Sequence, residues 1–225
     1  MTKPETSQAD DLTGLFNRKS FLAELSAALS NAKLSTHEVP FSVALIDIDR
    51  FYDINERYGH VGGDNVLEAF AQIAQEMAGE DAIPSRYGGD EFAFIFPNTE
   101  REQAFLRLEQ IRAAAIQREV VTEKGEHIQG IPVSGGVASF PIDGRSENEL
   151  LRKADQALYR AKIAGRSQVR LAYEERMVPK TSHFTQTQLE RLSKLSEERS
   201  VSEADLLREA MDDLLTKYGV NNIES

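Results

Sequence analysis

Four acidic residues stand where apolar segments of the chain end. Two close the apolar segment 41–46, and two follow a pair of glycines between two further apolar segments; along the chain they are Asp47, Asp49, Asp90 and Glu91. If these segments are neighbouring strands the carboxylates meet, and a pair about 4 Å apart repels by roughly 4 kcal/mol at an effective dielectric constant near 20. A divalent cation relieves that repulsion, and a few hard oxygen ligands with open coordination positions suit Mg²⁺ in nucleotidyl transfer. In the alternative interpretation, the acids only end a strand and form a turn.

The elements that would position these acids follow from the apolar periodicity. Helical spacing occurs at 19–34, 65–77 and 102–117, and a capping box at Ser146–Glu149 opens a helix that Gly165 closes. Strand-like segments occur at 41–46, 130–140 and 167–173, and the segments 83–86 and 92–96 predict a hairpin with both glycines at its tip. This order predicts an α+β fold of the ferredoxin-like or palm type, an antiparallel-containing sheet with helices on one face.

Five separated motifs resemble the GGDEF family of diguanylate cyclases. They stand in the family's order at residues 10–18, 47–55, 59–64, 86–92 and 154–166, so that the resemblance covers residues 10–171. Several motifs in order are far more specific than a lone Gly-Gly-Asp. The resemblance implies a nucleotide-cyclase-like fold and an enzyme that joins two GTP molecules into cyclic di-GMP. Each protomer of a dimer would present one GTP to the other.

The resemblance also implies a metal site and catalytic acids. By position, Asp47, the Ile48 carbonyl and Asp90 would hold Mg²⁺, with Mn²⁺ as the alternative ion. Glu91 would lie close to the attacking 3′-hydroxyl or to a second metal ion. These groups would supply charge neutralisation and alignment for attack on the α-phosphate. Asp49 is expected to brace the end of its strand rather than to bind metal.

Asn55 and Asp64 are the guanine-binding residues that the resemblance implies. An aspartate accepts hydrogen bonds from N1 and N2 of guanine, and adenine lacks that paired donor edge, so the site should favour GTP over ATP. Each residue also has a plain structural interpretation. Asn55 could cap a helix or a turn, and Asp64 could be the N-cap of the following helix.

Two cations and two backbone groups are expected at the triphosphate. Lys162 and Arg166 are four residues apart, which predicts one helical face from which both reach the phosphates. The backbone N–H groups of Phe51 and Tyr52 would add phosphate contacts. The alternative for the two cations is a solvated face near a helix C-terminus.

The chain departs from the family pattern at two places. Tyr52 stands where the family usually has a lysine that contacts phosphate, and losing that charge should weaken triphosphate binding by about 1–2 kcal/mol. Gly79 and Ala82 stand where the family has the Arg and Asp of its inhibitory product site. Product inhibition through that site is therefore not expected.

Composition bounds the remaining possibilities. The 225 residues carry a net charge of −11, which disfavours general affinity for nucleic acid or anionic membranes, and the lack of cysteine excludes disulfides and thiolate metal sites. No apolar run approaches the roughly 18 residues that a membrane span needs, and the first residues lack a signal-peptide core. We therefore expect a cytoplasmic protein without a membrane partner. A charge cluster with Pro179 after residue 173 predicts two domains, residues 1–175 and 176–225.

The second domain shows the pattern strand, helix, helix. Residues 180–184 are compatible with a strand, a capping box at Thr185–Gln188 precedes Leu189, Leu192 and Leu195, and a second capping signal at Ser202–Asp205 precedes a wide apolar stripe. About 45 residues cannot bury such a stripe alone. Residues 180–218 resemble the ribbon-helix-helix family, whose obligate dimers pair two strands and insert that ribbon into the DNA major groove.

This resemblance implies a homodimer or higher homo-oligomer, with DNA as a further partner. Thr181 and His183 would alternate outward from the ribbon, and Lys180 and Arg199 could meet phosphates. Six Lys/Arg against nine Asp/Glu in residues 180–225 give a net of −3, which is poor for DNA binding. Dimerisation without DNA, and a helical hairpin packed on the first domain, remain open. Because only nine residues precede Asp10 in this sequence, we expect something other than an upstream segment to pair the half-sites.

Two functional hypotheses follow. The first is a Mg²⁺-dependent diguanylate cyclase with GTP as substrate, held as a dimer by its C-terminal segment. The second is a DNA-binding transcription regulator that senses GTP or a cyclic dinucleotide with weak or no cyclase activity, for which Tyr52 is the supporting feature.

Overall fold

The computed structural model describes residues 8–34, 39–122, 124–172, 181–199 and 202–218. The chain divides into two compact units, Met1–Glu175 and Arg176–Ser225, and each is described by itself below. Among the helices of the described residues, none is both long enough and apolar enough to span a bilayer.

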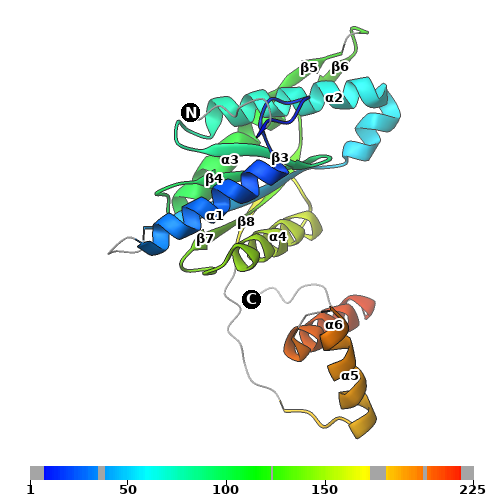
Figure 1. The fold of residues 1–225 in the computed structure, drawn as a ribbon. Helices are drawn as coiled ribbons and strands as arrows, with labels where there is room; N and C mark the ends of the chain where they lie inside the picture. Colours follow the sequence, from blue (N-terminus) through cyan, green and yellow to red (C-terminus); the bar gives the residue numbers. More distant parts are fainter. Residues whose placement is uncertain (1–7, 35–38, 123, 173–180, 200–201, 219–225) are drawn as a thin grey trace. The chain divides into compact units, whose positions relative to one another are not determined.

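A six-stranded mixed sheet forms the centre of the first unit (Figure 1). Its four inner strands run antiparallel to one another, while each edge strand runs parallel to the inner strand beside it. The spatial order is β1 (Phe16–Asn17), β3 (Ile83–Gly88), β4 (Glu91–Phe96), β2 (Phe41–Ile48), β7 (Val133–Phe140) and β8 (Val169–Leu171). The inner four strands have the predicted ferredoxin-like arrangement, so the predicted fold class is confirmed.

Helices cover both faces of this sheet, and the expectation that they cover one face was wrong. Ala44 and Ile46 of β2 share a core with α2 (Phe51–Met77) and α3 (Arg101–Gln117). Val43 and Leu45 share a second core with α1 (Arg18–Leu34) and α4 (Glu147–Ile163). All eight residues of β2 are buried, and a strand buried on both sides needs a layer on each. The unbroken apolar run 41–46 in the sequence already indicated a strand that is covered on both faces.

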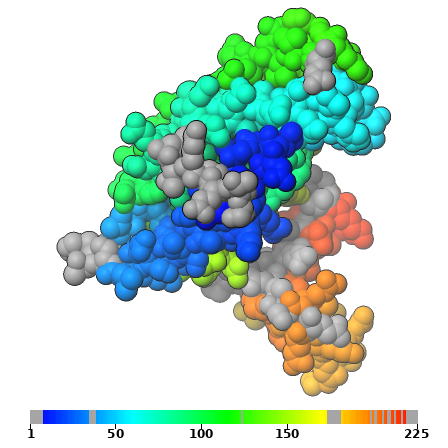
Figure 2. Space-filling view, turned by 45° about the horizontal axis from the view of Figure 1, so that its top comes forward, coloured from blue at the N-terminus to red at the C-terminus, as the bar shows by residue number. Residues whose placement is uncertain are grey.

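One helix is longer than predicted, and one hairpin was not predicted. The helix expected at 65–77 begins at Phe51, with a kink at Gly59, whose φ of 73° lies in the left-handed region. A hairpin of β5 (Glu119–Val121) and β6 (His127–Gln129) was not predicted, because its strands are three residues long and mostly exposed. This hairpin lies beside α2 (Figures 1 and 2).

The second unit contains α5 (Gln186–Arg199) and α6 (Glu203–Lys217). The predicted capping box at α5 is confirmed, because the Gln188 amide N–H donates to Thr185 Oγ1 at 3.3 Å and the Gln188 side chain accepts from the Thr185 N–H at 3.0 Å. Residues 181–185 form no strand within the single chain. A ribbon strand pairs only with a second chain, so the single chain does not test the expected strand.

Candidate active site

The two acidic segments meet at one end of the sheet. β2 and β4 are antiparallel neighbours in which Asp47 pairs with Glu91, and the Ile48 N–H donates to the Asp90 carbonyl at 3.2 Å. The end of one strand therefore meets the start of the other, and the turn between β3 and β4 brings Asp90 beside them. The expected convergence of the acids is present.

Asp47 experiences the mutual repulsion of this cluster. Burial raises the pKa of its carboxyl, a hydrogen bond and the charge of Lys162 lower it, and the charges of Asp90 and Glu91 raise it again, so that the pKa lies above its usual value. Lys162 Nζ lies 2.8 Å from Asp47 Oδ2. Odd-numbered β2 residues face α1 and α4, which explains why Asp47 meets a lysine of α4. One lysine neutralises only part of the cluster.

The available donors fit a hard divalent cation. They are the predicted ligands, two carboxylates and one backbone carbonyl, and their surplus negative charge is what a cation would neutralise. Among the described residues, no three or more acidic or histidine side chains gather closely enough to hold a metal ion by themselves. The metal set Asp47, Ile48 and Asp90 stays a prediction.

The start of α2 presents unpaired backbone donors. Arg50 precedes the helix with a left-handed φ of 57°, and its side chain makes no capping hydrogen bond. Phe51 and Tyr52 are the first two helical residues, whose N–H groups have no acceptor within the helix. The Tyr52 side chain is 72% exposed. A helix start of this kind suits an anion, as predicted for the triphosphate.

Asn55 lies against the segment that carries Asp64. A methyl group built on Gly63 would come within 2.0 Å of Asn55 Oδ1, so the backbone of Gly63 directly contacts the amide of Asn55. The kink at Gly59 turns the two parts of α2 toward each other, and the lack of a side chain at Gly63 permits the close approach. Asp64 is the next residue and is exposed. The structure thus places Asn55 against the residue that precedes Asp64, the second predicted guanine-binding residue.

Lys162 and Arg166 do not share a helical face, and that expectation was wrong. α4 ends at Ile163, and Arg166 follows in a turn with a left-handed φ of 64°. The Arg166 N–H donates to the Ala161 carbonyl at 3.0 Å, which ends the helix in a reversed turn instead of a further helical turn. Gly165 in the sequence was the signal for this stop. Both cations nonetheless belong to the same end of α4.

Two polar links were not identified from the sequence. The Arg86 guanidinium donates to the Gly89 carbonyl at 2.9 and 3.0 Å and pairs with Asp10 at 3.3 Å, which ties the hairpin tip to the N-terminal segment. The buried Asp49 carboxylate accepts hydrogen bonds from Ser134 and Ser167. Asp10, Arg86 and Asp49 all lie in the quoted motifs, but spacing alone gives no sign of their pairing.

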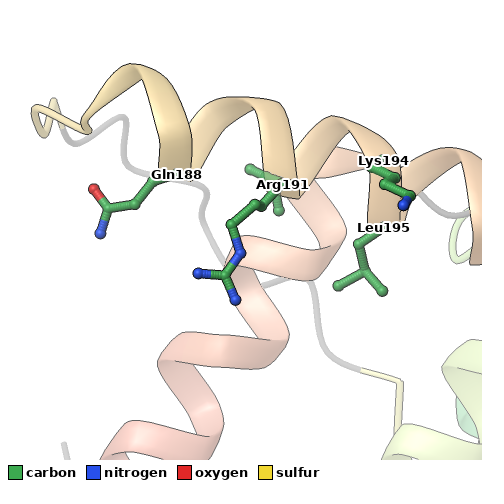
Figure 3. Close-up of a pocket in the computed structure, with 5 residues that line it drawn as sticks. Gln188, Arg191, Lys194 and Leu195 are labelled. Carbon is green, nitrogen blue, oxygen red and sulfur yellow. The ribbon is translucent and has the colours of Figure 1, made fainter.

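A shallow hollow of about 570 Å³ lies on the second unit. Residues of α5 line it: Gln188, Arg191, Leu192, Lys194 and Leu195. Arg191 and Leu195 extend from α5 on the side where α6 lies (Figure 3). Leu189, Leu195 and Leu214 stay 40–48% exposed, so this pair of helices leaves an apolar surface uncovered within the single chain.

Comparisons with protein families match both parts of the chain. Residues 7–168 match the family described as diguanylate cyclase, GGDEF domain. Residues 177–219 match the ribbon-helix-helix domain family.

Individual proteins support the first match. The response regulator PleD of Caulobacter vibrioides is 36% identical over 166 residues, which are 73% of this chain and 36% of that protein. A diguanylate cyclase of Vibrio cholerae is 36% identical over 163 residues, 72% of this chain and 49% of that protein. The chain thus matches less than half the length of either relative.

Solved structures share the fold of the first unit. The GGDEF domain of DgcB from Caulobacter crescentus, in complex with c-di-GMP, has a TM-score of 0.69 at 33% identity and covers 75% of this chain and 98% of that one. The GGDEF domain of PA1120 from Pseudomonas aeruginosa has a TM-score of 0.69 at 35% identity and covers 73% and 94%.

Proposed function

The chain belongs to the GGDEF family of diguanylate cyclases, and on that premise we propose that it condenses two GTP molecules into cyclic di-GMP. The observation that carries the proposal is the meeting of Asp47 with Asp90 and Glu91 at the end of the sheet, beside a lysine. Carboxylates that meet beside a lysine are suited to nucleotidyl transfer, because a divalent cation can bind the carboxylates and the lysine can bind phosphate.

Asp47, the Ile48 carbonyl and Asp90 would hold Mg²⁺, or Mn²⁺ in its place. The ion would supply charge neutralisation at the α-phosphate. Glu91, which is exposed and pairs with Asp47 across the two strands, would accept the proton of the attacking 3′-hydroxyl. Lys162 would leave Asp47 to bind the triphosphate, where Arg166 and the first N–H groups of α2 add further donors.

Guanine recognition would rest on Asn55 and Asp64. The contact of Asn55 with Gly63, the residue before Asp64, across the kink of α2 supports a single base-binding site. The Asp64 carboxylate would accept hydrogen bonds from N1 and N2 of guanine. Adenine would leave that carboxylate unpaired, so GTP is the proposed substrate.

The second unit would hold two copies of the chain together. Each half-site presents one GTP, so the reaction needs two chains face to face. The apolar residues that α5 and α6 leave exposed support pairing with a second copy, as does the match to a ribbon-helix-helix domain. Tethering through this pair would raise the effective concentration of the two half-sites.

Incubation with GTP and Mg²⁺, followed by chromatography of the nucleotides, tests the activity. The wild-type chain should form cyclic di-GMP, and Asp90→Ala should lose at least about 100-fold of the rate because a metal-binding carboxylate is gone. The matched control is Asp81→Ala, which removes an exposed aspartate ahead of the same hairpin and should leave the rate unchanged. Equal rates for wild type and Asp90→Ala would refute the assignment.

Truncation tests the role of the second unit. A chain that ends at Glu175 should lose activity at low protein concentration and regain it as the concentration rises, because its half-sites must then meet without a tether. Equal specific activity of the full and truncated chains at all concentrations would refute the proposal that the second unit holds two copies together.

A DNA-binding regulator is the second candidate, and the ribbon-helix-helix match favours it. In this case the first unit would bind GTP or a cyclic dinucleotide and turn it over slowly, in keeping with Tyr52 at the usual lysine position. Titration with random-sequence duplex DNA at two salt concentrations tests it. Affinity that falls steeply with salt supports DNA contact, and no affinity at low salt excludes it.

A further inference from the structure

Asp49 is a buried carboxylate that the proposed chemistry leaves without a role. It is 3% exposed, directly after β2 and two residues beyond Asp47. Its oxygens accept from Ser134 Oγ at 2.8 and 3.0 Å, and Oδ2 also accepts from the backbone N–H of Ser167 at 2.9 Å. Ser134 lies on β7, directly opposite Asp47. Asp49 therefore connects the end of β2 with the turn that follows α4.

That turn has a backbone that side chains disfavour. Arg166 has a φ of 64° and Ser167 a φ of 47°, and neither is glycine. A residue with a Cβ enters the left-handed region at a cost, so two in succession need external support. Gln168 Nε2 donates to the Ala161 carbonyl at 3.1 Å, and the Ser167 N–H itself donates to Asp49 Oδ2.

We propose that Asp49 is a positioning residue, which holds the turn at Arg166 and Ser167 so that the Arg166 guanidinium faces the triphosphate. The inference rests on the proposed function, in which Arg166 binds phosphate. The two acids at the end of β2 would then position the two cations at the end of α4. Asp47 holds Lys162 by a direct ion pair, and Asp49 holds Arg166 through the backbone of its neighbour.

The hydrogen bonds define what the Asp49 side chain must supply. Ser134 contacts both oxygens of Asp49, and the Ser167 N–H donates to one of them. An asparagine can accept from the Ser167 N–H through Oδ1 while its Nδ2 donates to the Ser134 hydroxyl, whereas an alanine offers no acceptor. Without an acceptor, the Ser167 N–H loses the hydrogen bond that ties the left-handed pair to the end of β2, and Arg166 then samples other directions.

A double-mutant cycle between Asp49 and Arg166 tests this role. GTP affinity is measured by calorimetry with Ca²⁺ in place of Mg²⁺ to suppress turnover, and KM and kcat are measured with Mg²⁺. Asp49→Ala and Arg166→Ala should each weaken GTP binding about tenfold and raise KM more than they lower kcat, as expected for lost phosphate contacts. The double variant should be no weaker than Arg166→Ala alone, because Asp49 acts through Arg166. Losses that multiply in the double variant would overturn the proposal.

Rescue provides a second readout. Ser167→Gly removes the cost of the left-handed backbone, so adding it to Asp49→Ala should restore part of the GTP affinity. Asp49→Asn keeps the volume of the side chain and one acceptor oxygen, and it should retain most of the GTP affinity that Asp49→Ala loses. Asp81→Ala is the control and should change nothing. A loss of GTP affinity in Asp49→Asn as large as that in Asp49→Ala, together with no rescue by Ser167→Gly, would also overturn the proposal.

The outcomes separate this inference from the proposed function. A wild-type chain that neither binds GTP nor forms product refutes the function, and the inference with it. A wild-type chain that binds GTP while the two substitutions act independently refutes only the positioning role.

Discussion

The two units of the chain treat their apolar residues in opposite ways. In the first unit, Phe21, Phe70 and Phe92 are fully buried between a six-stranded sheet and helices on both faces. In the second, α5 and α6 leave most of their large apolar residues exposed, including Met211 at 53% and Leu214 at 48%. The first unit completes its core within one chain, whereas the second has too few layers to do so.

This difference separates folding from assembly. Changes in the core of the first unit should act at every protein concentration, because all the contacts are within the chain. Changes on the exposed stripe of the second unit should act through association and depend on concentration. Under the proposed function, stability would reside in the first unit and the pairing of half-sites in the second.

Phe70→Ala should have the largest effect. Phe70 is fully buried on α2 and makes an edge contact with Phe92 at 4.6 Å between ring centroids. Its truncation should lower the free energy of unfolding by about 3–5 kcal/mol through lost burial and an unfilled cavity. Urea unfolding at two protein concentrations would measure this. Leu34→Ala, at an 84% exposed position, should change stability by less than about 0.5 kcal/mol. A concentration-dependent loss for Phe70→Ala would contradict the comparison.

Leu214→Asp should weaken the association that we expect of the second unit. A charge on the apolar stripe of α6 should raise the dissociation constant of the proposed dimer by about 100-fold, because burying an unpaired carboxylate opposes association. Sedimentation equilibrium would measure the constant. The matched control is Leu106→Asp on α3, a leucine of the first unit that is 60% exposed. Equal dissociation constants for both variants would show that α6 is not the dimer surface.

The sequence predicted the elements whose periodicity is set by the core. The run 41–46 became β2, and the apolar spacing of 102–117 became α3 within one residue, because burial selects one residue type at each position. It did not predict the helix from Phe51 to Tyr58, where an interrupting Gly59 and exposed polar residues hide the period. The glycines there serve the close contact of Gly63 with Asn55, which is a tertiary requirement.

The candidate site was predictable to the extent that strand pairing positions it. Asp47, Asp90 and Glu91 meet because β2 and β4 are antiparallel neighbours. Arg166 was placed on a helical face because of its four-residue spacing from Lys162, although Gly165, which ends the helix, stands before it. The supporting carboxylate of Asp49 reaches Ser167 across 118 positions of the chain, and no local pattern encodes such a contact.

Lys162→Met tests whether the first unit also satisfies its charges within one chain. Lys162 neutralises part of the charge of Asp47 through a direct ion pair. Removing the ion pair frees the Asp47 carboxylate, so Mn²⁺ alone, followed by its paramagnetic resonance, should bind about tenfold tighter, the ratio that corresponds to about 1.4 kcal/mol. GTP affinity should fall by a similar factor, because Lys162 is the proposed phosphate-binding cation. Arg152→Met, exposed on the same helix, should change neither. Weaker binding of both ligands would exclude competition between lysine and metal for Asp47.

Asp10→Asn should give the smallest effect and one that depends on pH. Burial alone would raise the pKa of Asp10, but hydrogen bonds from Thr13 and the charge of Arg86 outweigh it and hold the pKa below its usual value. A carboxyl with a lowered pKa in the folded state stabilises that state above its unfolded pKa of about 3.9, and the contribution is lost as the pH falls through the folded pKa.

The free energy of unfolding of Asp10→Asn should therefore lie below that of the wild type by less than about 1 kcal/mol at pH 7, as for a partly exposed ion pair. The difference should shrink as the pH falls below about 4, because the wild-type carboxyl then gains its proton. Urea unfolding across this range would follow it, with the exposed neighbour Asp11→Asn as the control. The dissociation constant of the dimer should stay unchanged in both variants, since Asp10 belongs to the unit that completes its own core. If the difference in free energy of unfolding between wild type and Asp10→Asn is constant with pH, Asp10 acts through packing, and its charge does not stabilise the first unit.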